Sequence, residues 1–372
     1  MKNVNKLSLS EVKSFLKKKG LKILNKKEKN FDSLIDFKSF YYTSIFSFIL
    51  VSLFFTLPII DNIKKNSQEV NNNSKSNLEK LLSGKSIETK KNDEIDSSKI
   101  FQDIFDFDDI SPDTVRLSAS VIEQLFIETN YNISDVRKNK IVKPISLSLL
   151  PNEIKKIENI QKRKNLFIQI ILPLILAETN QIRVDRNKLF VILNKNNNSE
   201  AEKKWLKIKL KQYGVKNNDL FTLKIRMDEV PTSLAIAQAA KETGWGTSRF
   251  ALEGNALFGQ WTYSGKGIKP LNTDSKETHK VMKFKILKAS IRAYYRNLNT
   301  HSSYKNFRKL RAELRDNDEK LDSLILVDHL DKYAATGKEY TMVLKKIISQ
   351  NFLKDFDDVK LLPTSRRLKN LI

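Results

Sequence analysis

The first marked feature of the chain is an apolar run near its start. Residues 40–60 are 21 consecutive residues without a formal charge. A helix rises about 1.5 Å per residue, so this run is long enough to span the roughly 30 Å hydrocarbon core of a bilayer. Residues 1–39 carry 11 Lys against 4 acidic residues, a charge of +7 that favours the cytoplasmic side. The pattern predicts an uncleaved transmembrane anchor, with the remainder of the chain outside the cytoplasm.

Two other interpretations of this run are weaker. A cleaved signal peptide has an apolar region of about 7–15 residues followed by a small-residue cleavage site. Here the longer run ends directly at Asp61 with no such site. A buried core helix is the third interpretation, which the many aromatic and β-branched residues and the lack of a polar face make less favoured.

A polar stretch follows the predicted anchor. Residues 61–100 contain 14 Asn and Ser, 8 Lys and 7 acidic residues, and no aromatic residue. Such a composition buries too little apolar surface to offset the entropy of ordering. The next ten residues, 101–110, are acidic and aromatic, and they either dock on a basic surface or form a solvated loop. We favour the solvated loop, so the predicted flexible linker covers residues 61–111.

From residue 112 onward the spacing of apolar residues predicts mainly helix. Pro112 and Pro151 each stand at a predicted helix start. The apolar run within residues 165–182 is too short and too close to charges to span a membrane, so it predicts a buried helix. Residues 200–212 alternate charged and apolar positions, and Gly214 predicts the end of that helix.

Composition narrows the function classes. The chain has 67 Lys and Arg against 43 Asp and Glu, a net charge of +24 that favours a polyanionic partner. The absence of cysteine excludes disulfides, thiolate metal sites and thiol nucleophiles. The three histidines form no recognisable metal pattern and no cofactor motif occurs, so we predict neither a metal nor a cofactor. An anchor that places the basic residues outside the cytoplasm argues against nucleic acid.

Glycine is scarce but concentrated. Six of the ten glycines lie within residues 244–267, together with Trp245 and Trp261. Glycine permits positive φ and close backbone approach, and tryptophan offers a broad flat contact surface. This segment predicts an irregular, aromatic-lined cleft that suits a sugar. Composition alone is equally compatible with turns around a core tryptophan.

A helix is predicted immediately before this segment. Pro231 suits its first turn, with Asp228 or Glu229 near the positive end of the helix dipole. Glu242 occupies the last turn, where the negative end of the dipole raises the pKa of a carboxyl group, and Trp245 adds desolvation in the same direction. A glutamate kept protonated near neutral pH is the general acid that cleavage of a glycosidic bond requires.

The residues around Glu242 resemble the glucosaminidase domain of bacterial Bax-type proteins, a cell-envelope family unrelated to the apoptosis regulator of that name. The resemblance is carried by VPTSLAIAQAAKETGWGTSRFA at residues 230–251 and GNALFGQW at residues 254–261, and it covers roughly residues 145–355. Further matching residues are Phe284, Ile291, Tyr294, Asn297, His301, Tyr304, Phe307, Arg308, Leu330, Tyr333, Gly337 and Tyr340.

The resemblance implies a lysozyme-like, mainly helical fold and hydrolysis of the β-1,4 bond after N-acetylglucosamine. It implies that Glu242 is the general acid and that Tyr333 faces it. The substrate-binding residues that it implies are Gln238 and Ser248, which flank the acid, and Asn255, Phe258, Gly259, Gln260, Trp261 and His301.

The second catalytic carboxylate is not fixed by the sequence. A two-carboxylate mechanism needs a base or nucleophile across the scissile bond. Asp274 and Glu277 are candidates, in a polar stretch that predicts a β-hairpin over the cleft. Lys280 stands where the family pattern has an acid. The N-acetyl group of the substrate is the alternative to a protein base.

We therefore predict a mainly α chain: a lysozyme-like helical domain with a small β-hairpin region, preceded by a helical extension, a flexible linker and one N-terminal transmembrane helix. The predicted parts are a basic cytoplasmic tail (1–39), the anchor (40–60), the linker (61–111), the extension (112–220), the glucosaminidase domain (221–357) and a basic C-terminal tail (358–372).

The predicted partner is the glycan strand of peptidoglycan. The predicted location is the bacterial inner membrane, with the catalytic domain on the periplasmic or extracytoplasmic side. Two alternatives stay open. One is a lytic transglycosylase of lysozyme-like fold, and the other is a catalytically silent peptidoglycan-binding protein.

Overall fold

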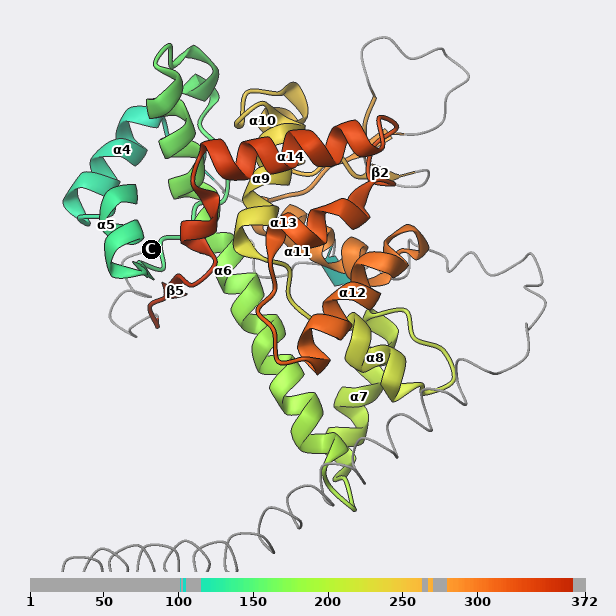
Figure 1. The fold of residues 1–372 in the computed structure, drawn as a ribbon. Coiled ribbons are helices and arrows are strands. Elements are labelled where there is room, and N and C mark those ends of the chain that lie inside the picture. Colours follow the sequence, from blue (N-terminus) through green and yellow to red (C-terminus); the bar gives the residue numbers. More distant parts are fainter. Residues whose placement is uncertain (1–100, 102, 105–114, 263–266, 270–279, 364–372) are drawn as a thin grey trace, which may run out of the picture. The chain divides into compact units, whose positions relative to one another are not determined.

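The computed structural model describes residues 101, 103–104, 115–262, 267–269 and 280–363, and this part is mainly helical, as predicted. The predicted tail, anchor and most of the linker lie outside the described residues, as do Asp274, Glu277 and residues 364–372. The elements (Figure 1) are α4 (Ala119–Glu128), α5 (Ile133–Asn139), β1 (Ile141–Val142), η1 (Asn152–Lys156), α6 (Ile160–Leu193), α7 (Glu200–Gln212), α8 (Leu220–Arg226), α9 (Thr232–Thr243), α10 (Arg249–Gly254), β2 (Trp261–Thr262), β3 (Gly267–Ile268), β4 (Lys280–Met282), α11 (Leu287–Thr300), η2 (Ser302–Tyr304), α12 (Lys305–Asp316), α13 (Ser323–Leu326), η3 (Val327–Leu330), α14 (Lys338–Gln350), η4 (Leu353–Phe356) and β5 (Lys360–Leu361).

Helix α9 lies inside the fold, and its composition explains how. Helices α6, α13 and α14 and the turn η4 pack around it (Figure 1). Every residue from Thr232 to Ala240 is buried. A helix that is buried on all sides must present little bulk to its neighbours, and the alanines of α9 let the surrounding elements approach closely.

Two predicted helices are confirmed. The apolar run of α6 is buried almost throughout from Leu166 to Leu176. Within the described part of the chain, α6 is the one helix long and apolar enough to cross a membrane, but 72% of its apolar window is buried inside the protein, as in a core helix. Helix α7 covers residues 200–212, and Gly214 follows with a φ of 59°.

Of two predicted helix starts, one is wrong and the other opens only a short 3-10 helix. Residues 115–118 are not helical, and α4 begins behind Ser118, whose side chain accepts a hydrogen bond from the first turn. Pro151 precedes only the short turn η1, and α6 begins behind a capping Asn159. In both segments a side chain that satisfies a free backbone N–H decides where the helix starts, and the proline does not.

The helices before and after residue 220 share one core. Strand β1 pairs in parallel with β5 near the C-terminal end of the described chain. Arg137 of α5 donates hydrogen bonds to the carbonyl oxygens of Phe352 and Asn351 at 2.7 and 2.8 Å. One buried apolar cluster runs from Ala119 to Val359. The predicted extension is therefore packed into the same compact unit as the helices that follow it.

The predicted β-hairpin region is a small three-stranded sheet. Strands β2 and β3 each pair antiparallel with β4, which lies in the centre although it comes last in sequence. Trp261 is opposite Val281, and Gly267 is opposite Met282. The sheet holds the chain at both ends of residues 261–282, of which the structure describes 261–262, 267–269 and 280–282.

The acidic and aromatic patch was predicted to be a solvated loop, and this is wrong for the residues that the structure describes. Phe101 and Ile104 are only 6% and 1% exposed. Asp103 forms an ion pair with Arg296 at 3.1 Å. The buried residues around them are Met282, Phe284, Ile286, Ala289 and Ala293. Phe101, Asp103 and Ile104 are docked on the helical domain, which was the alternative interpretation.

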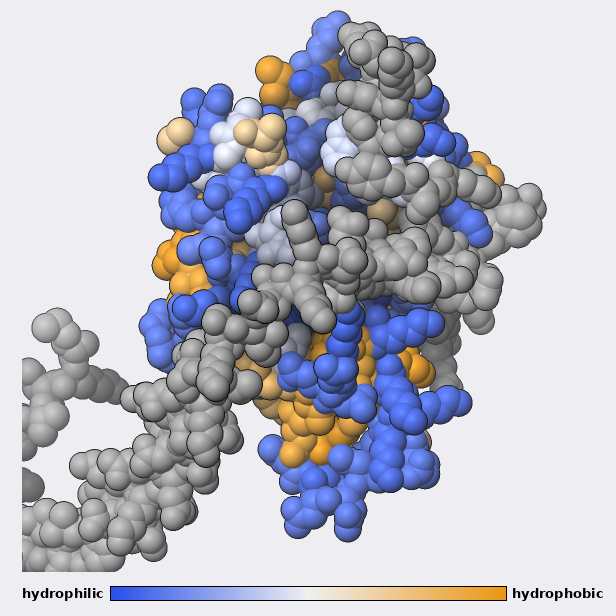
Figure 2. All heavy atoms as spheres, turned by 90° about the vertical axis from the view of Figure 1, so that its right-hand side faces the viewer, coloured by the Kyte–Doolittle hydropathy of each residue, from blue (hydrophilic) through white to orange (hydrophobic). Residues whose placement is uncertain are grey.

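The surface in Figure 2 is largely hydrophilic, with hydrophobic residues gathered toward its lower end. Helices α7 and α8 and the C-terminal half of α6 lie at this end of the molecule (Figure 1). The exposed large hydrophobic side chains of α7, α8 and the C-terminal half of α6 are Val184, Val191, Leu193, Ile208 and Phe221.

The connection from α8 to α9 is held by a buried charge cluster. Asp228 is 2% exposed and accepts ion pairs from Arg186, Arg311 and Arg315. Burial alone would raise the pKa of Asp228, but the three guanidinium groups together lower it below its usual value. Arg311, fully buried, also donates to the carbonyl oxygens of Asp228 and Glu229 at 3.2 and 2.9 Å. The cluster fixes where α9 begins.

Replacing Arg311 should therefore destabilise the fold. In Arg311→Met, Asp228 loses one buried cation and the backbone carbonyls lose their donor, so we expect the free energy of unfolding to fall by about 3 kcal/mol. The control is Lys309→Met on the same helix, where the side chain is 72% exposed. Urea unfolding followed by circular dichroism measures both. Equal stability of the two variants would contradict the role of the cluster.

Candidate active site

Helix α9 ends in a tight turn at the position predicted from the glycines. Gly244, Trp245 and Gly246 have φ of 56°, 60° and 85° in succession. Gly244 forms the left-handed cap of the helix. A side chain at Gly246 has no room, because its Cβ would lie 2.8 Å from the ring of Phe167 in α6. The turn thus holds Glu242 in the last turn of α9.

The Glu242 carboxyl group is contacted from two sides. Its Oε1 accepts a hydrogen bond from the Tyr340 hydroxyl at 2.9 Å. Its Oε2 faces Gly259, where an added Cβ would lie only 3.0 Å away. Burial raises the pKa of Glu242, and the Tyr340 hydrogen bond and the charge of Lys241 partly oppose this. The direction agrees with the sequence-based expectation, and burial is its largest cause.

A chain of hydrogen bonds runs from the core to Glu242. The Tyr294 hydroxyl donates to Oε1 of Gln238 at 2.8 Å. Nε2 of Gln238 donates to the Tyr340 hydroxyl at 3.1 Å, and that hydroxyl donates to Glu242. Gln238 is fully buried, and it reaches Glu242 only through the Tyr340 hydroxyl. Each hydroxyl has one defined direction, which fixes Tyr340 as a donor to the carboxyl group.

Tyr340 is the neighbour of Glu242 that sequence reasoning missed. It belongs to the matching residues, but 98 positions separate it from Glu242 and no local pattern links the two. Tyr333, implied to face the acid, instead donates its hydroxyl to the carbonyl oxygen of Phe258 at 2.9 Å. Its ring stacks on Tyr340, with centroids 5.5 Å apart. Tyr333 therefore stacks on the ring that makes the contact. Burial raises the pKa of Tyr333, and the charge of Glu242 acts in the same direction.

Two other implied site residues act inside the fold. Ser248 is the N-cap of α10, where its hydroxyl oxygen accepts a hydrogen bond from the backbone N–H of Ala251 at 3.2 Å. Phe258 is 1% exposed and stacks on Tyr294 with ring centroids 3.9 Å apart. These contacts shape the loop that carries Gly259.

The remaining residues of this loop have polar or exposed groups. Asn255 donates to the carbonyl oxygen of Phe284 at 3.0 Å, but its Oδ1 is buried without a hydrogen-bond partner in the described structure. Gln260 is 8% exposed, and both polar atoms of its side chain lack such a partner there. Trp261 is 49% exposed at the start of β2. The loop that carries Gly259 thus contains two side-chain amides with unpaired polar atoms and one exposed indole.

His301 has a local role in the structure. Its Nδ1 accepts a hydrogen bond from the backbone N–H of Ser303 at 3.2 Å, which caps η2. Burial lowers the pKa of His301, and the nearby Arg308 acts in the same direction. Among the described residues, no group of three or more His, Cys, Asp or Glu is placed to hold a metal ion.

The contacts at the two ends of α9 include residues that were not expected there from the sequence. Trp245 packs edge-on against Phe167 and beneath the Lys164 ammonium group, so its ring lies against α6. At the other end of α9, Asp357 accepts hydrogen bonds from the backbone N–H and the hydroxyl of Ser233, both at 2.8 Å. Burial raises the pKa of Asp357 to about 6. Asp357 therefore contributes a second carboxylate at the start of α9, near Asp228 and Glu229, which directly precede the helix.

The chain is similar to known proteins over the part that contains α9. The family model of mannosyl-glycoprotein endo-beta-N-acetylglucosaminidase matches residues 220–353, which include all of α9. The protein Bax of Escherichia coli (strain K12) is 34% identical over 210 residues, which are 55% of this chain and 75% of Bax. No solved structure matches the chain. The matched domain is that of a glycoside hydrolase-type enzyme with a glycan substrate. The chain belongs to the bacterial Bax family and carries a glucosaminidase domain.

Proposed function

We propose that this protein hydrolyses peptidoglycan, cleaving the β-1,4 bond after N-acetylglucosamine with Glu242 as the general acid. The observation that carries the proposal is the setting of the Glu242 carboxyl group. One oxygen is held by Tyr340, the other lies beside a residue without a side chain, and burial raises the pKa. The mainly helical fold agrees with the lysozyme-like fold that the resemblance implies.

The two carboxyl oxygens have different tasks in this proposal. Oε1 accepts the Tyr340 hydrogen bond, so the acidic proton resides on Oε2. Gly259 leaves room beside Oε2, because a Cβ at this position would lie 3.0 Å from that oxygen. The proton passes from Oε2 to the glycosidic oxygen as the bond between that oxygen and the sugar C1 breaks, and Glu242 becomes a carboxylate. Water then adds its oxygen to C1 and gives the new reducing end, and its proton passes to the group opposite Glu242 or, in a retaining route, to the Glu242 carboxylate.

The loop beside Glu242 supplies groups that suit an N-acetylated sugar. Buried polar atoms without partners are rare in native proteins and call for an explanation. An acetamido group has one N–H and one carbonyl oxygen, which complement the free carbonyl and amino groups of Gln260. The exposed indole of Trp261 offers a flat face for a sugar ring. Asn255 and Gln260 are the proposed contacts to the acetamido group.

The group opposite Glu242 determines the stereochemical course. Asp274 and Glu277 are candidates outside the described residues, and the acetamido group of the substrate is the third. A carboxylate that activates water directly inverts the anomeric centre. A covalent or acetamido-assisted intermediate retains it. The anomer of the first product therefore distinguishes direct attack by water from the other two routes.

The proposed site of action is the outer face of a bacterial inner membrane. The uncharged run at residues 40–60 and the +7 tail before it, both outside the described residues, support a single-pass anchor with that orientation. The remaining positive charge favours contact with anionic polymers of the cell envelope.

Glu242→Gln should remove the activity while the fold stays intact. A glutamine of the same shape accepts the Tyr340 hydrogen bond but has no proton to give, so we expect release of reducing N-acetylglucosamine ends from purified sacculi to fall about 10²- to 10⁴-fold. The control is Glu253→Gln, whose side chain is 57% exposed on α10. Wild-type activity in Glu242→Gln would exclude Glu242 as the acid.

Mass spectrometry of the same digests separates the alternatives. Hydrolysis gives a reducing N-acetylglucosamine end, whereas a lytic transglycosylase gives an anhydromuramic end. Binding of sacculi by the wild-type protein without released fragments would instead indicate a catalytically silent binding protein.

Tyr340→Phe should shift the pH profile. The Tyr340 hydrogen bond stabilises the ionised form of Glu242 and so lowers its pKa. Its loss raises that pKa, so the acid stays protonated to higher pH and the alkaline limb of kcat/KM moves to higher pH. Tyr333→Phe is the matched control, because its hydroxyl donates to Phe258. A shift of the alkaline limb in Tyr333→Phe but not in Tyr340→Phe would show that Tyr333, and not Tyr340, lowers the pKa of Glu242.

A further inference from the structure

The residues Phe101, Asp103 and Ile104, here called the docking segment, bind to the domain through two kinds of contact. Phe101 and Ile104 are buried among the apolar residues of β4, of α11 and of the chain between them. Asp103 contacts Arg296 through both carboxylate oxygens, at 3.1 and 3.3 Å. Gln212 of α7 donates to the same carboxylate at 3.2 Å. The segment therefore joins α7, α11 and the region of β4.

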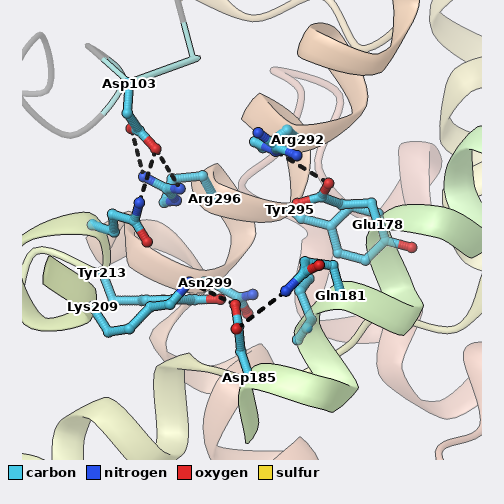
Figure 3. Close-up of a pocket in the computed structure, with 12 residues that line it drawn as sticks. Asp103, Glu178, Gln181, Asp185, Lys209, Tyr213, Arg292, Tyr295, Arg296 and Asn299 are labelled. Carbon is cyan, nitrogen blue, oxygen red and sulfur yellow. Dashed lines mark hydrogen bonds and ion pairs between the residues drawn. The ribbon is translucent and has the colours of Figure 1, made fainter. Parts of the chain in front are cut away.

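Asp103 lies at one side of a polar pocket of about 230 Å³ between α6, α7 and α11 (Figure 3). Arg296 is only 8% exposed there, so the Asp103 carboxylate is a partner for a nearly buried cation. Two more ion pairs line the pocket, Arg292 with Glu178 at 3.1 Å and Lys209 with Asp185 at 2.6 Å. Of these three ion pairs, that of Asp103 with Arg296 joins the residues farthest apart in sequence, 193 positions, against 114 for Arg292 with Glu178.

The chain under the docking segment also holds the loop of the candidate active site. The backbone N–H of Met282 donates to the carbonyl oxygen of Gln260 at 2.8 Å, and that of Phe284 donates to Gly254 at 2.8 Å. Asn255 donates back to Phe284 at 3.0 Å. Residues 280–286 therefore contact both the docking segment and the loop 254–260.

Residues 280–286 link the docking segment to the catalytic carboxyl group. Phe284 packs with Phe101 and Ile104 in one buried cluster, and its backbone binds the loop. The loop carries Gly259, which lies against Oε2 of Glu242. Contacts that follow one another without a gap are the physical route by which one site fixes the geometry of another.

We propose that the docking segment is a positioning element for the Glu242 site. When docked, it holds residues 280–286, and through them the loop 254–260, in the arrangement that brings Gly259 and Gln260 beside the acid. The proposal rests on the proposed function for its catalytic readout. On this proposal, the activity of the Glu242 site depends on residues that were predicted to belong to the flexible linker.

The test reverses the charge of Asp103 in the full-length protein. Asp103→Arg places a cation against Arg296 and should release the segment. We expect kcat on purified sacculi to fall on the order of tenfold, because a loop displaced by a fraction of an ångström misplaces the reacting groups. Backbone hydrogen exchange should rise in residues 101–104, 280–286 and 254–260, and stay unchanged in α14. Asp103→Glu keeps the carboxylate and should restore both readouts.

Glu200→Arg is the control for the change in charge, since that side chain is 88% exposed on α7. It should leave kcat and exchange unchanged. If Asp103→Arg does not fold, Asp103→Asn is measured in the same way. The proposal is overturned if residues 101–104 exchange faster while kcat and the exchange of 254–260 stay as in the wild type. A wild-type protein that releases no sugar ends would refute the proposed function, and the exchange measurement would still test positioning.

Discussion

The hydrogen-bond chain from Tyr294 through Gln238 and Tyr340 to Glu242 is the interaction on which the site depends. It crosses the helix that carries the acid and ends on only one oxygen of the carboxyl group. Because Gln238 has no access to water, its amide must find both partners inside the protein. The orientation of Tyr340 follows from that requirement. A buried carboxyl group with one oxygen held by Tyr340 and the other beside Gly259 is the outcome.

The rest of the fold keeps α9 where this chain can form. Small residues allow α6 and α14 to close around the helix, and Asp357 satisfies its first turn. The arginine cluster around Asp228 fixes the chain just before the helix. The turn at Gly244 fixes it just after. The N-terminal end of α9 is thus held by contacts from elements distant in sequence, and the C-terminal end by the turn that directly follows it, which leaves Glu242 little freedom to move.

Features set by neighbouring residues were predictable from the sequence. The end of α9 before the Gly244 turn and the α7 boundary follow from residues within a few positions of one another. The direction of the pKa shift of Glu242 was also predicted, but its largest cause is burial by the surrounding elements. Contacts between distant residues were not predictable. Tyr340 lies 98 positions from Glu242, and Asp103 lies 193 positions from Arg296. From its composition, the stretch 101–110 was predicted to be solvated. The composition of a segment does not reveal the apolar surface that β4 and α11 form together in the fold.

The most direct test of this account is the pKa of Glu242 itself. The side-chain carboxyl carbon can be followed by ¹³C NMR across the pH range and assigned by its absence in Glu242→Gln. The account predicts a midpoint above the ordinary glutamate value of 4.5, because burial outweighs the Tyr340 hydrogen bond. A midpoint at or below that value would show that Glu242 is ionised at neutral pH. That result would contradict its role as the general acid.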